Sequence, residues 1–165
     1  MPRIVMFLAA FALALTASVR SEAGPFEDGV MAYDEGHYGV AKTLFEGLVA
    51  SGHASAETML GIMYFNGQGV VQDRFIAAIY FYKSARRGNA NAQLALGSLY
   101  IQGIGVGADT ATAYKWVSLA EKAADGQLAE AARELRQRLG AGLSDQERQS
   151  VDAIVDQWEP VRAYK

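Results

Sequence analysis

The chain has 165 residues, contains no cysteine, and carries 15 basic and 18 acidic residues, for a net charge of -3. Without cysteine it forms neither a disulfide nor a cysteine zinc site, so its stability must come from packing. The acidic excess offers no basic face for neutralising phosphates, and nucleic acid is therefore not an expected partner.

Residues 1–23 resemble a secretory signal peptide. Arg3 precedes the apolar run 4–19, which is shorter than the ~20 residues that a membrane-spanning helix needs. Small residues follow in Ser21-Glu22-Ala23, and we expect cleavage after Ala23 and a periplasmic or secreted protein. The alternative is an uncleaved anchor, because Arg20 and Glu22 are unusual so close to a cleavage site. Only in that case would the protein contact a membrane.

The remaining 142 residues are enough for one domain with a hydrophobic core. Residues 24–51 predict a first helical hairpin, with helices of roughly Phe26–Glu35 and Tyr38–Ala50. Glycine, aromatic and small residues are spaced there in a pattern that resembles a degenerate tetratricopeptide repeat: Gly29, Tyr33, Gly36, Tyr38, Ala41, Phe45 and Val49.

A repeat with a period of 36 residues follows. Residues 60–73 read LGIMYFNGQGVVQD and residues 96–109 read LGSLYIQGIGVGAD. A fixed period of this size is typical of stacked helical hairpins. The matched pairs are Ala56 and Ala92, Leu60 and Leu96, Gly61 and Gly97, Tyr64 and Tyr100, Gly67 and Gly103, Gly69 and Gly105, Val70 and Val106, Asp73 and Asp109, and Ala77 and Ala113.

The first helix of each unit contains a conspicuous glycine. Ala56, Leu60 and Tyr64 form one helical stripe, and Gly61 lies beside it. Glycine inside a helix costs about 1 kcal/mol relative to alanine, so its return at Gly97 indicates a close approach. We expect the second helix of the hairpin to cross there, with Ala77 and Ala113 as the small residues that face it.

The repeated GxG could also indicate a phosphate-binding loop. Such a loop follows a strand and contains a third glycine or a Walker lysine, and neither condition holds here. We therefore predict a helix end with left-handed glycines. Val70 and Val106 would turn back into the core, and Asp73 and Asp109 would stand near the start of the next helix.

The pattern Ala-x3-Leu-Gly-x2-Tyr-x2-Gly-x-Gly-Val-x2-Asp-x3-Ala resembles the Sel-one-like repeat, a relative of the tetratricopeptide repeat. Two copies cover residues 52–87 and 88–125, the second being two residues longer in its second helix. The basic residue usual before the second-helix alanine is replaced by Ile76 and Thr112. The resemblance implies an all-α fold, a right-handed α-solenoid of stacked helical hairpins, and a role in scaffolding complexes.

Residues 126–165 predict a partial repeat and a capping helix. Gln127–Leu139 is expected to be helical, and Ser144-Asp145-Gln146-Glu147 has the SxxE form of a capping box. It opens a terminal helix that ends before Pro160 and covers the end of the stack. Its apolar side contains Val151, Ile154, Val155 and Trp158.

Residues suited to catalysis are sparse. His37 and His53 lie in predicted turns, where an exposed and inert histidine is expected, and neither has metal-ligand spacing around it. The adjacent Asp34 and Glu35 precede a turn glycine and are expected to be solvated. We therefore expect no catalytic residue, metal ion or cofactor.

The predicted binding surface is the concave groove that the first helices of such arrays line. Large apolar residues with amides beside them suit an extended peptide. Alternatively, neighbouring hairpins bury these side chains. The aromatic set Phe75, Tyr80, Phe81 and Tyr82 is expected to be core. The predicted groove residues are Phe26, Val30 and Tyr33, then Thr58, Ile62, Phe65 and Asn66, then Leu94, Ser98, Ile101 and Gln102.

The sequence therefore predicts an exported, non-catalytic adaptor that holds a protein or peptide segment of the cell envelope. One alternative is a periplasmic cell-wall enzyme or glycan-binding protein that uses Tyr33, Asp34 and His37. Another is a structural module whose stacked ends pair with a second copy.

Overall fold

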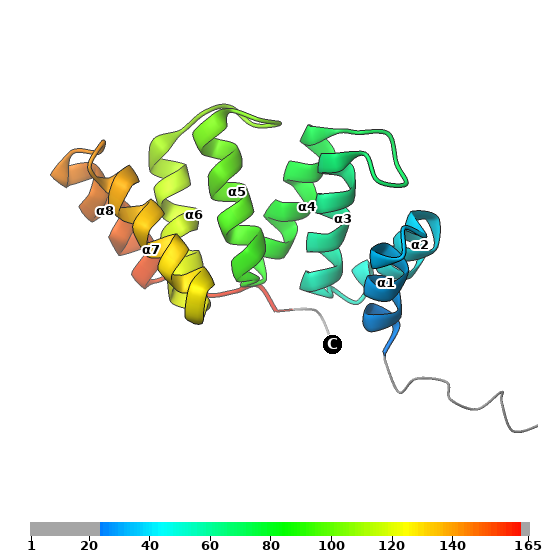
Figure 1. The fold of residues 1–165 in the computed structure, drawn as a ribbon. Helices are drawn as coiled ribbons and strands as arrows, with labels where there is room; N and C mark the ends of the chain where they lie inside the picture. The colour runs from blue at the N-terminus through cyan, green and yellow to red at the C-terminus, as the bar shows by residue number, and fades with distance from the viewer. Residues whose placement is uncertain (1–23, 163–165) are drawn as a thin grey trace, which may run out of the picture.

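A computed structural model describes residues 24–162, which form eight α-helices (Figure 1). No strand occurs in this range, so the predicted all-α fold is confirmed. The signal-peptide prediction falls on residues 1–23, outside the described range. The helices are α1 (Pro25–Asp34), α2 (Tyr38–Val49), α3 (Ala54–Asn66), α4 (Arg74–Arg86), α5 (Ala90–Gln102), α6 (Thr110–Ala123), α7 (Gly126–Gly140) and α8 (Asp145–Asp156).

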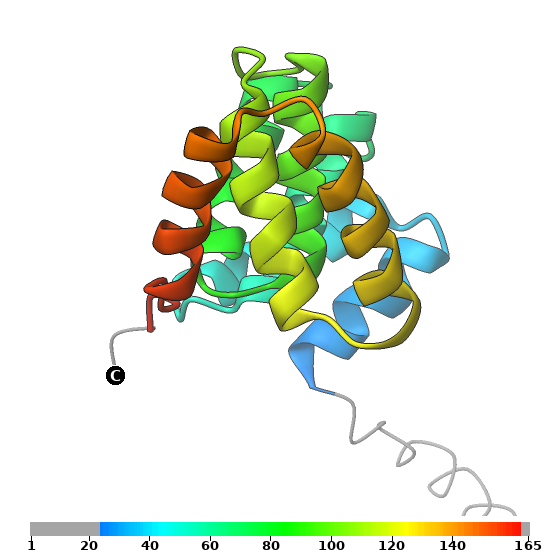
Figure 2. The ribbon, with the colours of Figure 1, turned by 90° about the vertical axis from the view of Figure 1, so that its left-hand side faces the viewer.

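The helices pack in chain order as hairpins. The pairs α3 and α4, and α5 and α6, make the most extensive contacts, followed equally by α1 with α2 and by α6 with α7. Contacts of α2 with α3 and of α4 with α5 join successive hairpins. The last two helices depart from this scheme, because both pack on α6, which lies between them (Figure 2). The predicted capping helix is therefore α8, which packs along α6. Helix α6 is one residue longer than α4, where two were expected.

In each of the first three hairpins, the second helix packs directly on a glycine of the first helix. A Cβ on Gly61 would stand 2.7 Å from the Phe81 ring, and a Cβ on Gly97 would stand 2.6 Å from Cγ2 of Val117. Gly29 meets Phe45 in the same way, at 2.6 Å. These distances are shorter than real side-chain contacts, which confirms that the second helix crosses at the glycine. Ala77 and Ala113 are both fully buried.

The two GxG segments end helices, as predicted. Gly67 and Gly103 are left-handed caps with φ of 75° and 67°. Gly69 and Gly105, both at φ 69°, have a second role: Gly69 touches Tyr38, and Gly105 touches the main-chain carbonyl of Arg74. Each loop therefore rests on the first residue of the preceding second helix, where a side chain on the glycine would collide.

The residues after each GxG segment also lie where they were predicted. Val70 and Val106 are partly buried against the core. Asp73 caps α4 by accepting from the N–H groups of Phe75 and Ile76, both at 2.9 Å, and Asp109 caps α6 by accepting from that of Thr112 at 3.0 Å.

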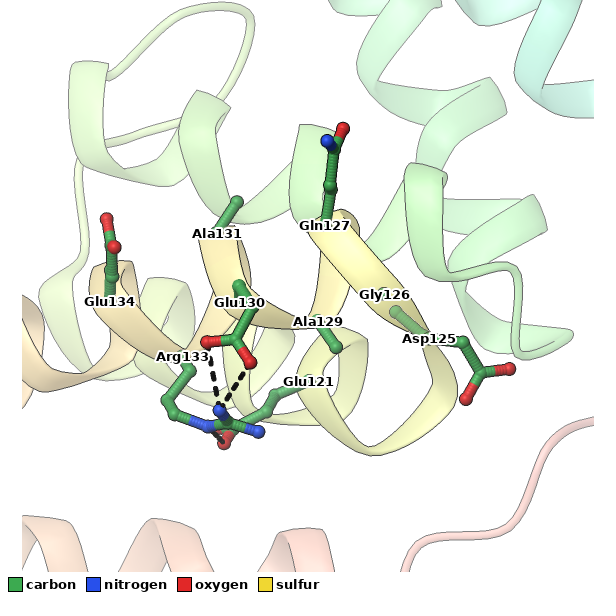
Figure 3. A pocket seen from close by; sticks show the side chains of 10 residues that line it. Glu121, Asp125, Gly126, Gln127, Ala129, Glu130, Ala131, Arg133 and Glu134 are labelled. Carbon is green, nitrogen blue, oxygen red and sulfur yellow. Dashed lines mark hydrogen bonds and ion pairs between the residues drawn. The ribbon is translucent and has the colours of Figure 1, made fainter.

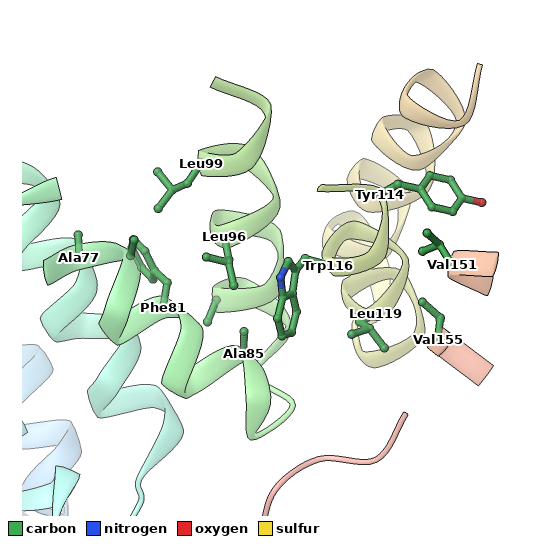
Figure 4. Close-up of a cluster of buried hydrophobic side chains, with 12 residues drawn as sticks. Ala77, Phe81, Ala85, Leu96, Leu99, Tyr114, Trp116, Leu119, Val151 and Val155 are labelled. Carbon is green, nitrogen blue, oxygen red and sulfur yellow. The ribbon is translucent and has the colours of Figure 1, made fainter. Parts of the chain in front are cut away.

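The largest core cluster runs from α4 to α8 (Figure 4). Trp116 lies at its centre among side chains of α4 and α5, while Val151 and Val155 close it from α8. The Ser144–Glu147 capping box is present. The assignment of Ile154 to the apolar side was wrong, because Ile154 is 54% exposed. After α8 the chain passes below α5, and the Val161 N–H donates to the Arg86 carbonyl at 2.8 Å (Figure 1).

Candidate binding surfaces

The surface predicted to bind a partner lies on α3 and α5, and its exposed part is at their C-terminal ends. Ile101 is 40% exposed, and Asn66 and Gln102 occupy equivalent, exposed positions in the two repeats. Ile101 therefore offers apolar contact area beside the Gln102 amide. Asn66 donates to Gln68 at 3.1 Å and Gln102 donates to the Ser98 carbonyl at 3.3 Å, so it is mainly their carbonyl oxygens that remain to accept hydrogen bonds from a peptide backbone.

Other predicted groove residues are partly buried. Ile62 and Phe65 are half-buried against the core cluster that runs from α4, the second helix of their own hairpin, to α8, and Arg74 of α4 lies 6.0 Å from the centre of the Phe65 ring. Leu94 is half-buried against a cluster of Val117 and Ala120 on α6 and Ala132 on α7. The expected alternative of burial therefore applies to these three side chains in part, and helices of their own hairpins contribute to it.

Thr58 does not belong to a surface. Its side chain is buried, with 7% of the residue exposed, and its hydroxyl lies 2.7 Å from that of Ser84. Ser84 in turn donates to the Ala54 carbonyl at 2.7 Å. A hydroxyl pair between α3 and α4 occupies this position, so its assignment to the groove was wrong. Ser98 is half-buried and donates to the Leu94 carbonyl at 3.0 Å.

The predicted residues on α1 are partly used in holding the first hairpin to the second. The Tyr33 hydroxyl donates to Gln68 at 2.6 Å, and Gln68 donates to the Tyr38 hydroxyl at 3.1 Å. Phe26 stacks on His53 with ring centres 4.8 Å apart. These contacts fix the side chains of Phe26 and Tyr33, and Val30 is the third half-buried residue of the set.

The histidines have structural partners. Nδ1 of His53 accepts from the Ala56 N–H at 3.2 Å and so caps α3, which makes this half-buried residue different from the exposed turn histidine that was predicted. His37 is exposed beside Glu35, with 3.2 Å between Nδ1 and the carboxylate. In the trio Tyr33, Asp34 and His37, the Tyr33 hydroxyl already donates to Gln68, so it is left to a glycan as an acceptor alone. In residues 24–162 no three His, Asp or Glu side chains are grouped to hold a metal ion.

The first of the two matched repeats contains a buried ion pair. Nε of Arg87 donates to the Glu57 carboxylate at 3.1 Å, and Glu57 is 1% exposed. Burial raises the pKa of Glu57, and the positive charge of Arg87 opposes that rise without cancelling it. The pair joins α3 to the end of α4, so we assign it to the fold.

An open hollow lies where α6 meets α7 (Figure 3). Arg133 crosses it, donating to Glu121 at 3.1 Å and to Glu130 at 2.9 Å (Figure 3). Glu121 and Glu130 are thus neutralised within the protein, while Asp125 and Glu134, which also line the hollow, form no ion pair with any residue in the range 24–162.

A second exposed surface was missed by the sequence analysis. Of the aromatic residues assigned to the core, Phe81 is buried and Tyr80 is half-buried, but Phe75 is 64% and Tyr82 43% exposed. Ile79 is exposed between them. The i, i+4, i+7 spacing of Phe75, Ile79 and Tyr82 was the available signal, because it places them on one stripe of α4, opposite the Phe81 stripe.

The fold and these surfaces define a class: an α-helical repeat protein of stacked hairpins. The profile of the Sel1 repeat matches residues 54–89 and 90–126, so the chain contains two Sel1 repeats, and the resemblance to the Sel-one-like repeat family is confirmed. No curated protein matches the sequence. None of the helices in residues 24–162 has the length and hydrophobicity to cross a membrane.

Two solved structures share the fold. One is c5321, described as a protective antigen of uropathogenic Escherichia coli strains with an SLR fold, at a TM-score of 0.71 and 25% identity over 81% of this chain and 29% of that one. The other is a Sel1 repeat protein from Oxalobacter formigenes, at a TM-score of 0.57 and 24% identity over 64% of this chain and 46% of that one. The matched part is less than half of either neighbour.

Proposed function

We propose that this Sel1 repeat protein is an exported, non-catalytic adaptor that binds a segment of another cell-envelope protein on the face formed by α3 and α5. The observation that carries the proposal is the exposure of Ile101, Asn66 and Gln102 at the matched C-terminal ends of the first helices of two repeats. Repeated amides at a fixed spacing suit the regular backbone of an extended peptide.

The half-buried side chains support the same surface. Ile62 and Phe65 are each partly exposed and partly packed on the core cluster that begins at α4, so their positions are fixed before a partner arrives. A rigid surface loses little conformational entropy on binding, which favours affinity.

The experiment compares two exposed isoleucines. Ile101→Asp places a charge on the proposed face, and Ile154→Asp places the same charge on α8, away from it. Affinity purification from the native envelope, with quantitative mass spectrometry, should recover a partner protein with the wild type and Ile154→Asp and lose it at least tenfold with Ile101→Asp. Equal recovery with both variants would overturn the proposed face, provided that both keep the wild-type unfolding midpoint.

A further inference from the structure

The outer stripe of α4 is unusual among equivalent helices. The repeat alignment pairs Phe75, Ile79, Tyr82 and Arg86 with Gly39, Thr43, Glu46 and Ala50 of α2, and all eight positions are exposed. The architecture therefore exposes this stripe in both hairpins. In α2 it is small or polar, whereas in α4 it is large and apolar. In α6 the corresponding Ser118 is buried, and α8 packs on that helix.

Cations without partners surround the α4 stripe. Arg74, Lys83 and Arg86 on α4 and Lys115 on α6 form no ion pair with any residue in the range 24–162. Each lies over an aromatic ring instead, at 4.7 to 6.0 Å from its centre. Such a contact holds a cation in place without forming an ion pair. Glu57 and Asp109 act on Lys83 and Lys115 only at longer range.

The opposite combination occurs on α1. Met31 is 52% exposed, and Glu27, Asp28 and Asp34 form no ion pair within the part of the chain that the structure describes. A hollow of about 460 Å³ runs along this face, lined by Phe26, Glu27, Val30, Met31, Asp34 and Glu35. No basic residue lies on α1. The same chain therefore carries an acidic apolar helix face and a basic apolar helix face.

We propose that the α1 face of one copy docks on the α4 stripe of a second copy. The two faces are similar in length, since the 10 residues of α1 span about 15 Å and the stripe from Phe75 to Arg86 spans about 18 Å at 1.5 Å per residue. Free carboxylates meet free cations along the contact, and Met31 meets the stripe of Phe75, Ile79 and Tyr82. Burial of apolar surface supplies the attraction, and the charges set the pairing and its direction.

This contact joins two different surfaces, and within one copy α2 and α3 stand between them (Figure 1). A pairing of unlike surfaces is heterologous, so assembly continues head to tail beyond a dimer unless a ring closes. It uses neither Ile101 nor Gln102, and it is therefore separable from the proposed adaptor face.

The test is a charge swap, measured by sedimentation equilibrium of protein purified from its native host. The wild type should show a mass that rises with concentration in low salt and an association at least tenfold weaker in 0.5 M salt, because ion pairs between exposed groups are screened. Lys83→Glu with Arg86→Glu should make the protein monomeric. So should Glu27→Lys with Asp34→Lys.

Mixing these two monomeric variants should restore association, because the reversed α4 of one then faces the reversed α1 of the other, and their unchanged faces also match. Gln127→Glu, Gln137→Glu and Arg138→Glu together make the same change in net charge as the α4 reversal, at exposed positions of α7 away from both faces, and this variant should associate like the wild type. A wild type that stays monomeric, an association that survives both reversals, or a mixture that stays monomeric would overturn the proposal. Binding of the monomer to phosphatidylglycerol vesicles, lost with the α4 reversal, would assign the stripe to a membrane and also overturn it.

Discussion

The two Sel1 repeats share the residues that fix the backbone, here called the frame, and differ in the side chains that pack between their helices. In both repeats, a glycine of the first helix contacts the second helix, a pair of left-handed glycines follows the end of the first helix, and an aspartate caps the start of the second helix. Between the helices, the first repeat buries Glu57 against Arg87 and Thr58 against Ser84. The second has Gln93, Leu94, Ala120 and Ala123 at those places. Backbone geometry thus requires particular residues at few positions, and the interior between helices is free to vary.

The largest effect should come from removing the cation of the first repeat. Arg87→Ala leaves the Glu57 carboxylate buried without a counter-charge, which costs 3–5 kcal/mol for fully buried pairs. We expect about 3 kcal/mol at pH 8, the low end of that range, because the Arg87 side chain is 25% exposed. Urea unfolding measures the change, with Arg86→Ala as the neighbouring exposed control.

The loss of stability caused by Arg87→Ala should depend on pH. The folded-state pKa of Glu57 lies above its unfolded value, so the stability that this carboxyl contributes is fully present below the unfolded pKa and declines as pH rises through the folded pKa. Without Arg87 that pKa rises further. The destabilisation by Arg87→Ala should therefore grow from pH 4 to pH 8, and a loss that is equal at both would contradict the buried-charge explanation.

A smaller loss is expected at the loop glycines that the repeats share. Gly105→Ala forces an L residue into φ 69° and presses a Cβ against the Arg74 carbonyl, which should cost about 2 kcal/mol. Gly69→Ala, at the same φ and 2.6 Å from Cβ of Tyr38, should cost a similar amount. Gly107→Ala is the matched control, since a Cβ there meets nothing within 4 Å. A destabilised Gly107→Ala would show that the loop tolerates no alanine at all.

The capping aspartates should matter less and almost equally. Asp73→Ala and Asp109→Ala each remove a side-chain acceptor at a helix start, worth about 1 kcal/mol. Hydrogen bonds from the backbone and hydroxyl of Thr112 lower the pKa of Asp109. Its contribution is therefore present above the unfolded pKa and lost as pH falls through the folded pKa. Thermal unfolding of Asp109→Ala and wild type should converge towards pH 3, and a gap that stays constant would contradict this.

The smallest effect is expected at Gln93. Oε1 of Gln93 is buried and has no hydrogen-bond partner among residues 24–162, while Nε2 donates to the Ala85 carbonyl at 3.1 Å. That carbonyl also accepts from the Gly88 N–H at 3.0 Å, so Gln93→Leu leaves it satisfied. We expect a change within about 1 kcal/mol, neutral or stabilising. A loss above that amount, measured by urea unfolding, would show that the buried amide has an unseen partner.

The frame was predictable from the sequence, because glycine at a helix crossing and aspartate at a helix start leave direct marks in residue type and spacing. The surface was less so. Thr58 was assigned to the groove and is buried against Ser84, whereas Phe75 and Tyr82 were assigned to the core and are exposed. Helical periodicity tells which residues share a stripe. Which stripe remains exposed to solvent depends on the rotation of each hairpin against its neighbours. That rotation is set by contacts between residues far apart in the chain.

The C-terminal end of the stack was likewise predictable only in part from the sequence. The Ser144–Glu147 capping box marked the start of α8 correctly. Its position along α6, on the side away from α7, has no local signal, because it depends on the fit of Val151 and Val155 into a cluster formed by residues of α4, α5 and α6. Ile154, in the same apolar pattern, is left in solvent.

The most direct test of the adaptor function is site-specific photocrosslinking in the native envelope. A photoreactive amino acid at position 101 should form an adduct with one partner protein, and the same group at position 154 should not. Adducts at 101 that match those at 154, or none at 101 while the protein is folded and abundant, would contradict the claim that the face of α3 and α5 binds a segment of another protein.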